Sequence, residues 1–107
     1  MIGLTIKQLR YFDALARHHH FGRAAEACSI SQPALSLQIK DLENMAGAPL
    51  VERGARTIHL TALGEDFILK AREVLIAVDE LEDLMRASQG PFSGRFRLGV
   101  IPTVAPY

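Results

Sequence analysis

Residues 21–47 read FGRAAEACSISQPALSLQIKDLENMAG, and this stretch predicts two helices separated by a tight turn. The first helix is expected to run to about residue 28, because its apolar side chains recur at i, i+3, i+4 and i+7 and therefore share one face. The side chains on that face are Phe21, Ala24, Ala25 and Cys28. The two alanines are small enough to let a neighbouring helix approach closely.

The second helix is expected from Ser31 to about Ala46. Ser31 is a favourable N-cap, and Pro33 is tolerated in the first turn because the amide hydrogen that it lacks would have no partner there. Gly47 is a natural stop for the helix. Two helices joined by a turn of about three or four residues form a helix-turn-helix.

The helix expected over 31–46 separates into two faces when its residues are placed at intervals of about 100°. The inner face holds Leu35, Ile39, Leu42 and Ala46. The outer face near the N-terminus holds Gln32, Pro33, Ser36 and Leu37, with Lys40 farther along. Such a face suits the edges of DNA bases, because glutamine can bond to adenine in a bidentate manner, serine can donate or accept, and apolar groups can contact a thymine methyl. A plain solvated helix is an equally good interpretation of this segment alone.

Residues 50–60 predict a small β-hairpin. Arg53 and Arg56 flank its turn, and a turn that exposes arginine can enter a narrow minor groove. An ordinary solvated hairpin is the alternative interpretation, but a helix-turn-helix followed at once by a basic hairpin favours DNA binding. Contacts with the DNA backbone, which position a protein without specifying sequence, are then expected from Arg10, Arg23, Ser31 and Lys40.

Two further helices complete the predicted fold. Residues 5–17 form one of them, with a capping box between Thr5 and Gln8. Residues 61–88 form a long helix, capped by Thr61 and roughly 40 Å in length. Its apolar residues alternate spacings of four and three, as in a coiled coil: Phe67, Ala71, Val74, Val78, Leu81 and Met85. This seam predicts a dimer, while Ile68 and Leu75 widen the apolar face toward the helix's own domain.

The predicted fold is therefore mainly α. A winged helix-turn-helix of three helices and a small hairpin wing spans residues 1–60, and a dimerisation linker helix spans 61–88. Residues 89–107 begin as a hinge by composition and continue with a strand-like alternation. Because a strand without partners is not stable alone, we expect 89–107 to be a hinge and the start of a second domain that this chain lacks.

Composition limits the partners that can be expected. Among 107 residues, 12 basic side chains balance 12 acidic ones, and a net charge of zero counts against binding to nucleic acid. The distribution softens this objection, since residues 1–60 carry seven basic against five acidic groups and residues 61–107 carry five against seven. No apolar run reaches the length of a membrane span, and no secretory start is visible. A cytoplasmic location without a membrane partner is expected.

Catalysis, a cofactor and a metal site are not expected. The sequence shows no paired acid and base, no nucleophile with a base and no phosphate-binding glycine loop, so the chain is expected not to be an enzyme. His18, His19 and His20 would point about 100° apart on a helix and would not converge on one ion, which favours a solvated turn. Cys28 is the only cysteine and is expected to pack as a small apolar residue.

Taken in order, several stretches of residues 4–88 resemble the LysR-type transcriptional regulators. They are Leu9-Arg10-Tyr11-Phe12, Phe21-Gly22-Arg23-Ala24-Ala25, Ser31-Gln32-Pro33-Ala34-Leu35-Ser36, Ile39 to Leu42-Glu43, Leu50-Val51-Glu52-Arg53 and Leu60-Thr61-Ala62-Leu63-Gly64. Residues 85–107 resemble the peroxide-sensing OxyR-like branch of that family. The resemblance implies a homodimer joined through long linker helices, usually within a tetramer, and a C-terminal effector domain.

The resemblance also implies a partner, double-stranded DNA with imperfect inverted repeats. It assigns base contacts to Gln32, Pro33, Ser36 and Leu37, and a minor-groove contact of the wing to Arg56. Leu37 departs from the family, in which a polar or basic residue is common at this place. We therefore expect a sequence-specific DNA-binding domain. The alternative is a helical protein-interaction adaptor that dimerises through 61–88 without reading DNA.

Overall fold

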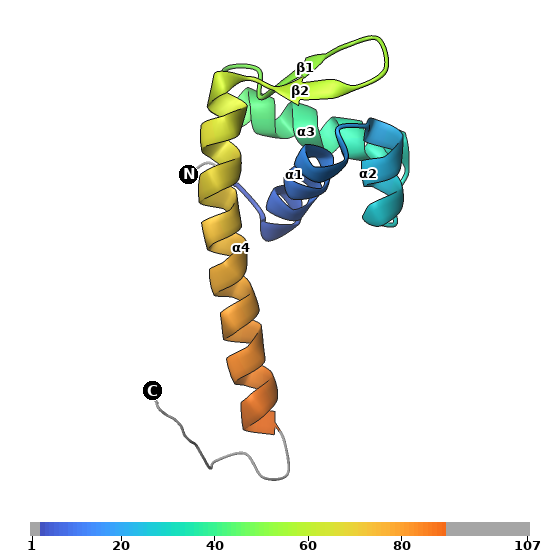
Figure 1. Cartoon of the computed structure of the whole chain (residues 1–107). Coiled ribbons are helices and arrows are strands. Elements are labelled where there is room, and N and C mark those ends of the chain that lie inside the picture. Colours follow the sequence, from blue (N-terminus) through green and yellow to red (C-terminus); the bar gives the residue numbers. More distant parts are fainter. Residues whose placement is uncertain (1–2, 90–107) are drawn as a thin grey trace. The chain divides into compact units, whose positions relative to one another are not determined.

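The computed structural model describes residues 3–89 and confirms the predicted fold class (Figure 1). Its elements are α1 (Ile6–His18), α2 (Phe21–Ala27), α3 (Gln32–Ala46), β1 (Val51–Arg53), β2 (Ile58–Leu60) and α4 (Ala62–Gln89). One compact unit ends at Leu75 and a second begins at Ile76, so the two halves of α4 belong to different units. The hinge predicted from residue 89 starts on the last residue of α4, and the strand predicted after it lies outside the described residues.

Helix α1 begins and ends on local hydrogen bonds that the sequence encodes. The Thr5 hydroxyl accepts from the Gln8 backbone N–H at 3.2 Å, and the Gln8 side-chain oxygen accepts from the Thr5 N–H at 3.0 Å, which confirms the predicted capping box. At the other end, His19 is left-handed with φ of 55°, and its N–H donates to the Leu15 carbonyl. This αL residue closes α1 and turns the chain toward α2.

The helix-turn-helix has the caps expected of it. The Ser31 hydroxyl accepts from the Ala34 N–H at 3.2 Å, and Pro33 occupies the first turn of α3. Gly47 is left-handed with φ of 74°, and its N–H donates to the Glu43 carbonyl at 2.8 Å. The predicted bounds of α3 are therefore confirmed to within one residue.

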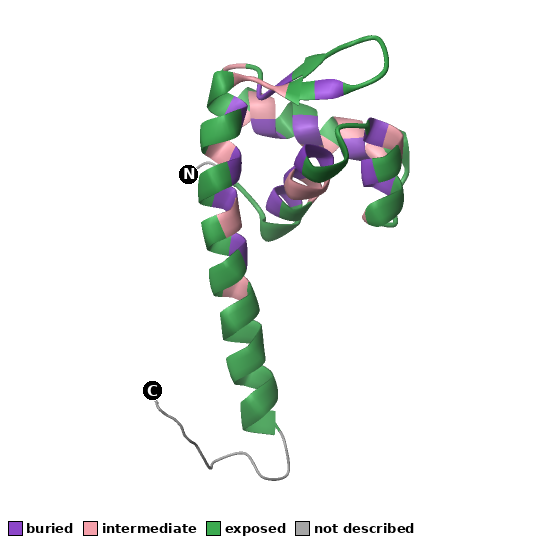
Figure 2. Cartoon of the chain, in the orientation of Figure 1, coloured by how far each residue is buried: buried purple, intermediate pink, exposed green. Residues whose placement is uncertain are grey.

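The core of the first unit forms where α1, α2 and α3 face one another (Figure 2). Phe12 and Leu15 on α1 and Leu35 and Ile39 on α3 are fully buried. Ala46 was expected on the inner face of α3 but is exposed, because it is the last residue of the helix and the chain turns away at the next position. Burial of these apolar side chains sets the direction in which α3 points its opposite face.

The hairpin is antiparallel, with Val51 opposite Leu60 and Arg53 opposite Ile58, as the sequence predicted in outline. It is tied to the helices at both strands. The Glu43 carboxylate on α3 accepts from the N–H groups of Leu50 at 2.8 Å and Val51 at 3.2 Å. The Ile58 N–H donates to the carbonyl of His19 at 2.9 Å. These bonds hold the hairpin against the ends of α1 and α3.

The first half of α4 packs on the same unit. Thr61 caps the helix, because its hydroxyl accepts from the Gly64 N–H at 3.0 Å. The Phe67 ring meets the Phe12 ring edge to face with 5.1 Å between centroids, and Ala71 is only 3% exposed. Asp13 on α1 accepts from the guanidinium groups of Arg72 at 2.9 Å and Arg17 at 3.1 Å. Two members of the expected seam, Phe67 and Ala71, thus contribute to the core of their own unit.

Gly64 provides the sharpest test of this packing. A Cβ at this position would overlap the backbone carbonyl oxygen of Leu50. That oxygen accepts the Thr61 N–H at 3.0 Å, so a shift of the Leu50 carbonyl would disturb this hydrogen bond. We expect Gly64→Ala to lower the free energy of unfolding by about 3 kcal/mol, measured by urea denaturation. Gly47→Ala is the matched control, since it adds a Cβ in open space and should cost about 1 kcal/mol through its positive φ alone. Equal losses in the two variants would contradict the close approach.

Candidate nucleic-acid interface

The outer face of α3 lies opposite its buried residues. Gln32, Pro33 and Lys40 are exposed, Ser36 is half-buried, and Leu37 is 70% exposed, more than any other exposed large apolar side chain of the described residues. Since the inner face of α3 is buried in the core, these groups lie together on the side of the helix that faces away from it. The face therefore combines an amide, a hydroxyl and an aliphatic group in adjacent turns, which is the chemistry needed to contact base edges.

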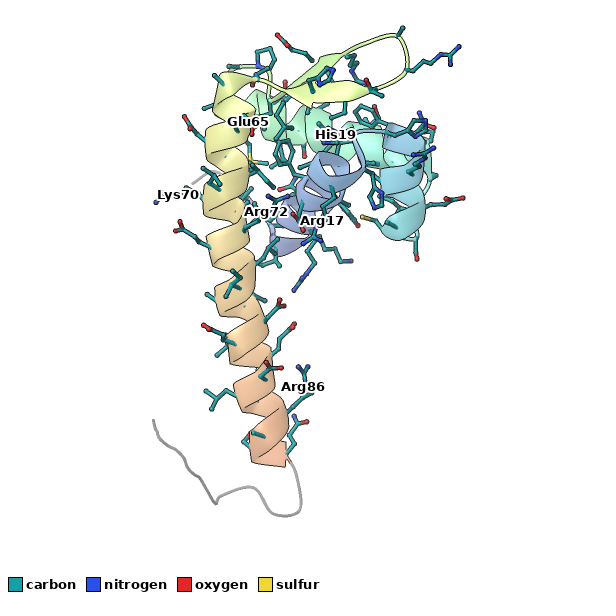
Figure 3. All side chains as sticks on the ribbon, viewed as in Figure 1. Arg17, His19, Glu65, Lys70, Arg72 and Arg86 are labelled. Atoms are coloured by element: carbon teal, nitrogen blue, oxygen red, sulfur yellow. The ribbon has the colours of Figure 1, made fainter. Side chains whose placement is uncertain are left out.

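The three histidines were expected to form a simple solvated turn, but two of them make specific hydrogen bonds. The Nδ1 atom of His19 lies 3.3 Å from the carbonyl oxygen of Ile58, which can only accept, so this Nδ1 carries a proton (Figure 3). The Nδ1 atom of His20 instead accepts from the Arg23 N–H at 3.1 Å and caps α2. In its neutral form His20 therefore carries its proton on Nε2.

The sequence offered no strong signal for these roles, because histidine is not among the preferred N-cap residues. The left-handed backbone of His19 could not be predicted from the sequence either, since His19 is held by hydrogen bonds to Ile58 of β2, which is distant in the chain. Among residues 3–89, no three side chains of histidine, cysteine, aspartate or glutamate are grouped so that they could hold a metal ion.

A basic cleft, here called the wing cleft, lies between the hairpin turn and the start of α2. It consists of two cavities of about 520 and 200 Å³ that share His20 and Arg56 in their walls. The larger is also lined by His18 and Arg23, and the smaller reaches Gln32 at the start of α3. No carboxylate lines either cavity in the described part of the chain, so the cleft has a positive lining although the whole chain is neutral.

Arg53 and Arg56, both expected to contact DNA from the wing, have different surroundings. The Arg53 guanidinium lies over the Phe21 ring, 4.3 Å from its centroid, in a cation–π contact that joins β1 to α2. Arg56 lies in the exposed turn between the strands. The structure thus brings Gln32, Arg23 and Arg56 to one cleft, whereas Arg10 lines a separate pocket on α1.

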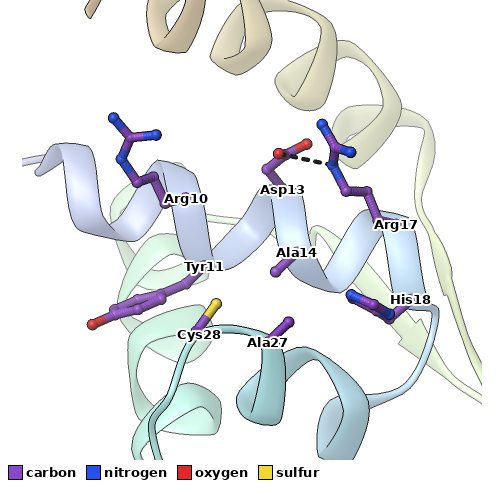
Figure 4. Close-up of a pocket in the computed structure, with 8 residues that line it drawn as sticks. All are labelled: Arg10, Tyr11, Asp13, Ala14, Arg17, His18, Ala27 and Cys28. Carbon is purple, nitrogen blue, oxygen red and sulfur yellow. Dashed lines mark hydrogen bonds and ion pairs between the residues drawn. The ribbon is translucent and has the colours of Figure 1, made fainter. Parts of the chain in front are cut away.

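That second pocket, of about 360 Å³, lies between α1 and the end of α2 (Figure 4). Its lining includes Arg10, Tyr11 and the half-buried Cys28. Burial, and to a lesser extent the negative charge of Asp13, raises the pKa of the Cys28 thiol. The thiol is therefore held in its protonated form, although it is half-buried at the wall of the pocket and not buried with Ala24 and Ala25 as the expected inner face implied.

The raised pKa predicts slow thiol chemistry. Because only the thiolate reacts, Cys28 in the folded chain should be alkylated by iodoacetamide at pH 8 several times more slowly than in the chain unfolded in urea. The difference should shrink as the pH rises, since the folded thiol ionises at higher pH than the unfolded one. The rate is measured by mass spectrometry, and equal rates in the two states at pH 8 would contradict the shielding.

Three helices, a tight turn and a hairpin wing define a winged helix-turn-helix. Residues 6–65 match the family model of the bacterial regulatory helix-turn-helix proteins of the lysR family. The chain therefore belongs to the lysR family. Among the described residues, no helix has the length and apolar character needed to cross a membrane.

Individual relatives agree with this assignment. The chain is 48% identical over 103 residues to a probable hydrogen peroxide-inducible genes activator of Streptomyces viridosporus, and 42% identical over 104 residues to the transcriptional dual regulator OxyR of Escherichia coli. These matches cover 96% and 97% of the chain but only 33% and 34% of the relatives, so the chain spans about a third of their length.

Solved structures give the same picture. Full-length OxyR from Pseudomonas aeruginosa superimposes with a TM-score of 0.77 and 39% identity, covering 81% of this chain and 30% of that one. The DNA-binding domain of CbnR, solved in complex with DNA, superimposes with a TM-score of 0.74 and 36% identity, covering 81% of this chain and all of that one.

Proposed function

We propose that the chain is the sequence-specific DNA-binding part of a transcriptional regulator, with α3 in the major groove and the hairpin in the adjacent minor groove. The observation that carries this proposal is that Gln32, at the start of α3, and Arg56, in the wing, line one cleft free of carboxylates. If α3 were only a solvated surface helix, there would be no reason for Gln32 and Arg56 to line the same cleft. The solved complex of the related CbnR domain with DNA supports it.

The proposed contacts fall into two groups. Base edges would be met by the outer face of α3, through Gln32, Pro33, Ser36 and Leu37. The phosphate backbone would be met by Arg10, Arg23, Ser31 and Lys40, and the minor groove by the wing through Arg53 and Arg56. Because backbone contacts supply most of the affinity and base contacts the selectivity, the two groups should respond differently to substitution.

A protein with zero net charge has little general attraction for DNA. We propose that useful affinity comes from two copies, which present two recognition helices to grooves one or more helical turns apart. The seam for pairing would lie on α4, where Val74, Leu81 and Met85 are 43%, 58% and 55% exposed. Residues 1–60 would then read DNA, residues 61–88 would link the two copies, and 89–107 would lead into an effector-binding domain.

The relatives suggest the setting of this activity. Two of them are named as hydrogen peroxide-inducible activators or as OxyR, and we propose that this chain serves a cytoplasmic regulator of the same kind, assembled as a dimer or tetramer. It would act without catalysis and without a cofactor of its own. A protein-interaction adaptor, the alternative that the sequence left open, is not favoured by membership of a family of regulatory helix-turn-helix proteins.

The first test is selection of duplexes from a random pool by the whole chain, followed by affinity measurements on the enriched sequence. Gln32→Ala should weaken binding to that sequence by roughly 1–3 kcal/mol and relax the preference at one base pair of each half-site. Arg23→Ala is the contrasting variant, since loss of a phosphate contact should weaken binding to all duplexes and lower the salt slope by about one. Equal weakening of all duplexes by Gln32→Ala would contradict base reading.

The second test concerns pairing through α4. Light scattering of the whole chain should give twice the monomer mass of 11.8 kDa. Leu81→Glu should return the mass to that of a monomer, because it places a charge in the proposed seam. Leu69→Glu is a matched control, since Leu69 is 62% exposed on another line of the same helix. A monomer before substitution, or dissociation by the control alone, would contradict the seam.

A further inference from the structure

The wing cleft joins two places that the proposed function assigns to different grooves of DNA. Gln32 at one end would lie in the major groove. Arg56 at the other would enter the adjacent minor groove, where its forked guanidinium can also contact a phosphate of the strand that borders the groove. In duplex DNA these grooves are separated by one sugar–phosphate strand. If both ends are occupied, that strand must cross the cleft.

We infer that the wing cleft is a seat for one backbone phosphate of each DNA half-site, held by the Nε2–H of His20 and by the cations of Arg23 and Arg56. This inference rests on the proposed function. It adds a ligand, a phosphodiester group, for the turn at His18 to His20, to which the sequence assigned no function. All three residues line the larger cavity, and all three are exposed to solvent.

The orientation of His20 is fixed without any DNA. Its Nδ1 is engaged by the Arg23 N–H at 3.1 Å, so the neutral ring has its donor on the opposite nitrogen. Gly22 makes room for this ring, because a Cβ there would come within 2.9 Å of the Cε1 atom of His20. Because the His20 ring is already held by these contacts, its Nε2–H would lose little conformational entropy when it donates to a phosphate oxygen.

The charge around the seat also fits an anion. Arg23 and Arg56 supply two cations, and His18 adds a third basic group at the wall of the larger cavity. Arg53 of β1 lines the smaller cavity, where its guanidinium lies over the Phe21 ring. Carboxylates are absent from the lining of both cavities in the described chain. The Glu26 carboxylate lies in a neighbouring pocket, which His18 and Arg23 also line.

The test uses the enriched duplex from the selection and replaces each phosphate in turn by a neutral methylphosphonate. For the unmodified chain, one replacement per half-site, at the boundary between the contacted grooves, should weaken binding about tenfold. His20→Asn is the informative variant, because asparagine keeps the capping acceptor but lacks the distant donor. It should bind the unmodified duplex about tenfold more weakly and should lose most of the extra penalty at that one phosphate.

His59→Asn is the matched control, since His59 is an exposed histidine of β2 that does not line the wing cleft. It should show the same methylphosphonate profile as the unmodified chain, and thermal unfolding should show that His20→Asn remains folded. Arg56→Gln, tested in the same way, should also lose the penalty at that phosphate. Equal profiles for His20→Asn and the unmodified chain would overturn the inference, whereas failure to enrich any duplex would overturn the proposed function itself.

Discussion

Burial of one face of α3 against α1 is the constraint on which the rest of the domain depends. Leu35 and Ile39 have no exposed surface, and they meet a core that includes Phe12 and Leu15 of α1. Each such side chain contributes roughly 1.5–3 kcal/mol when it leaves water. Rotation of α3 about its axis would expose this apolar surface, so the opposite face, centred near Leu37, must point outward. The orientation of the proposed reading face is thus set by the core.

The wing is held by a different kind of interaction. A hairpin of two three-residue strands is not stable alone, and hydrogen bonds from the helices hold it in place. Glu43 on α3 accepts two N–H groups at the start of β1, and His19 at the end of α1 binds both the N–H and the carbonyl of Ile58. Since α1 and α3 pack together in the core, both strands of the hairpin are hydrogen-bonded to elements whose relative position the core sets.

Charge is arranged locally, which reconciles a neutral chain with an anionic partner. Asp13 is paired with Arg17 and Arg72 between α1 and α4, and Glu43 is occupied by backbone N–H groups. These carboxylates stabilise the fold and stay away from the wing cleft, where basic side chains gather. Summing charges over the sequence hides this separation, which is why composition alone counted against DNA binding.

By itself the sequence determined the helices, the caps at Thr5, Ser31, Gly47 and Thr61, and the exposed face of α3, because each follows from local spacing and local hydrogen bonds. The tertiary structure decided the rest. It buried Ala71 of the expected seam in the core of its own unit and packed Phe67 against that core. It also left Ala46 exposed at a helix end and gave His19 and His20 opposite proton positions. It also brought Gln32 and Arg56 to one cleft. These features arise from contacts between residues distant in the chain, and no spacing in the sequence encodes them.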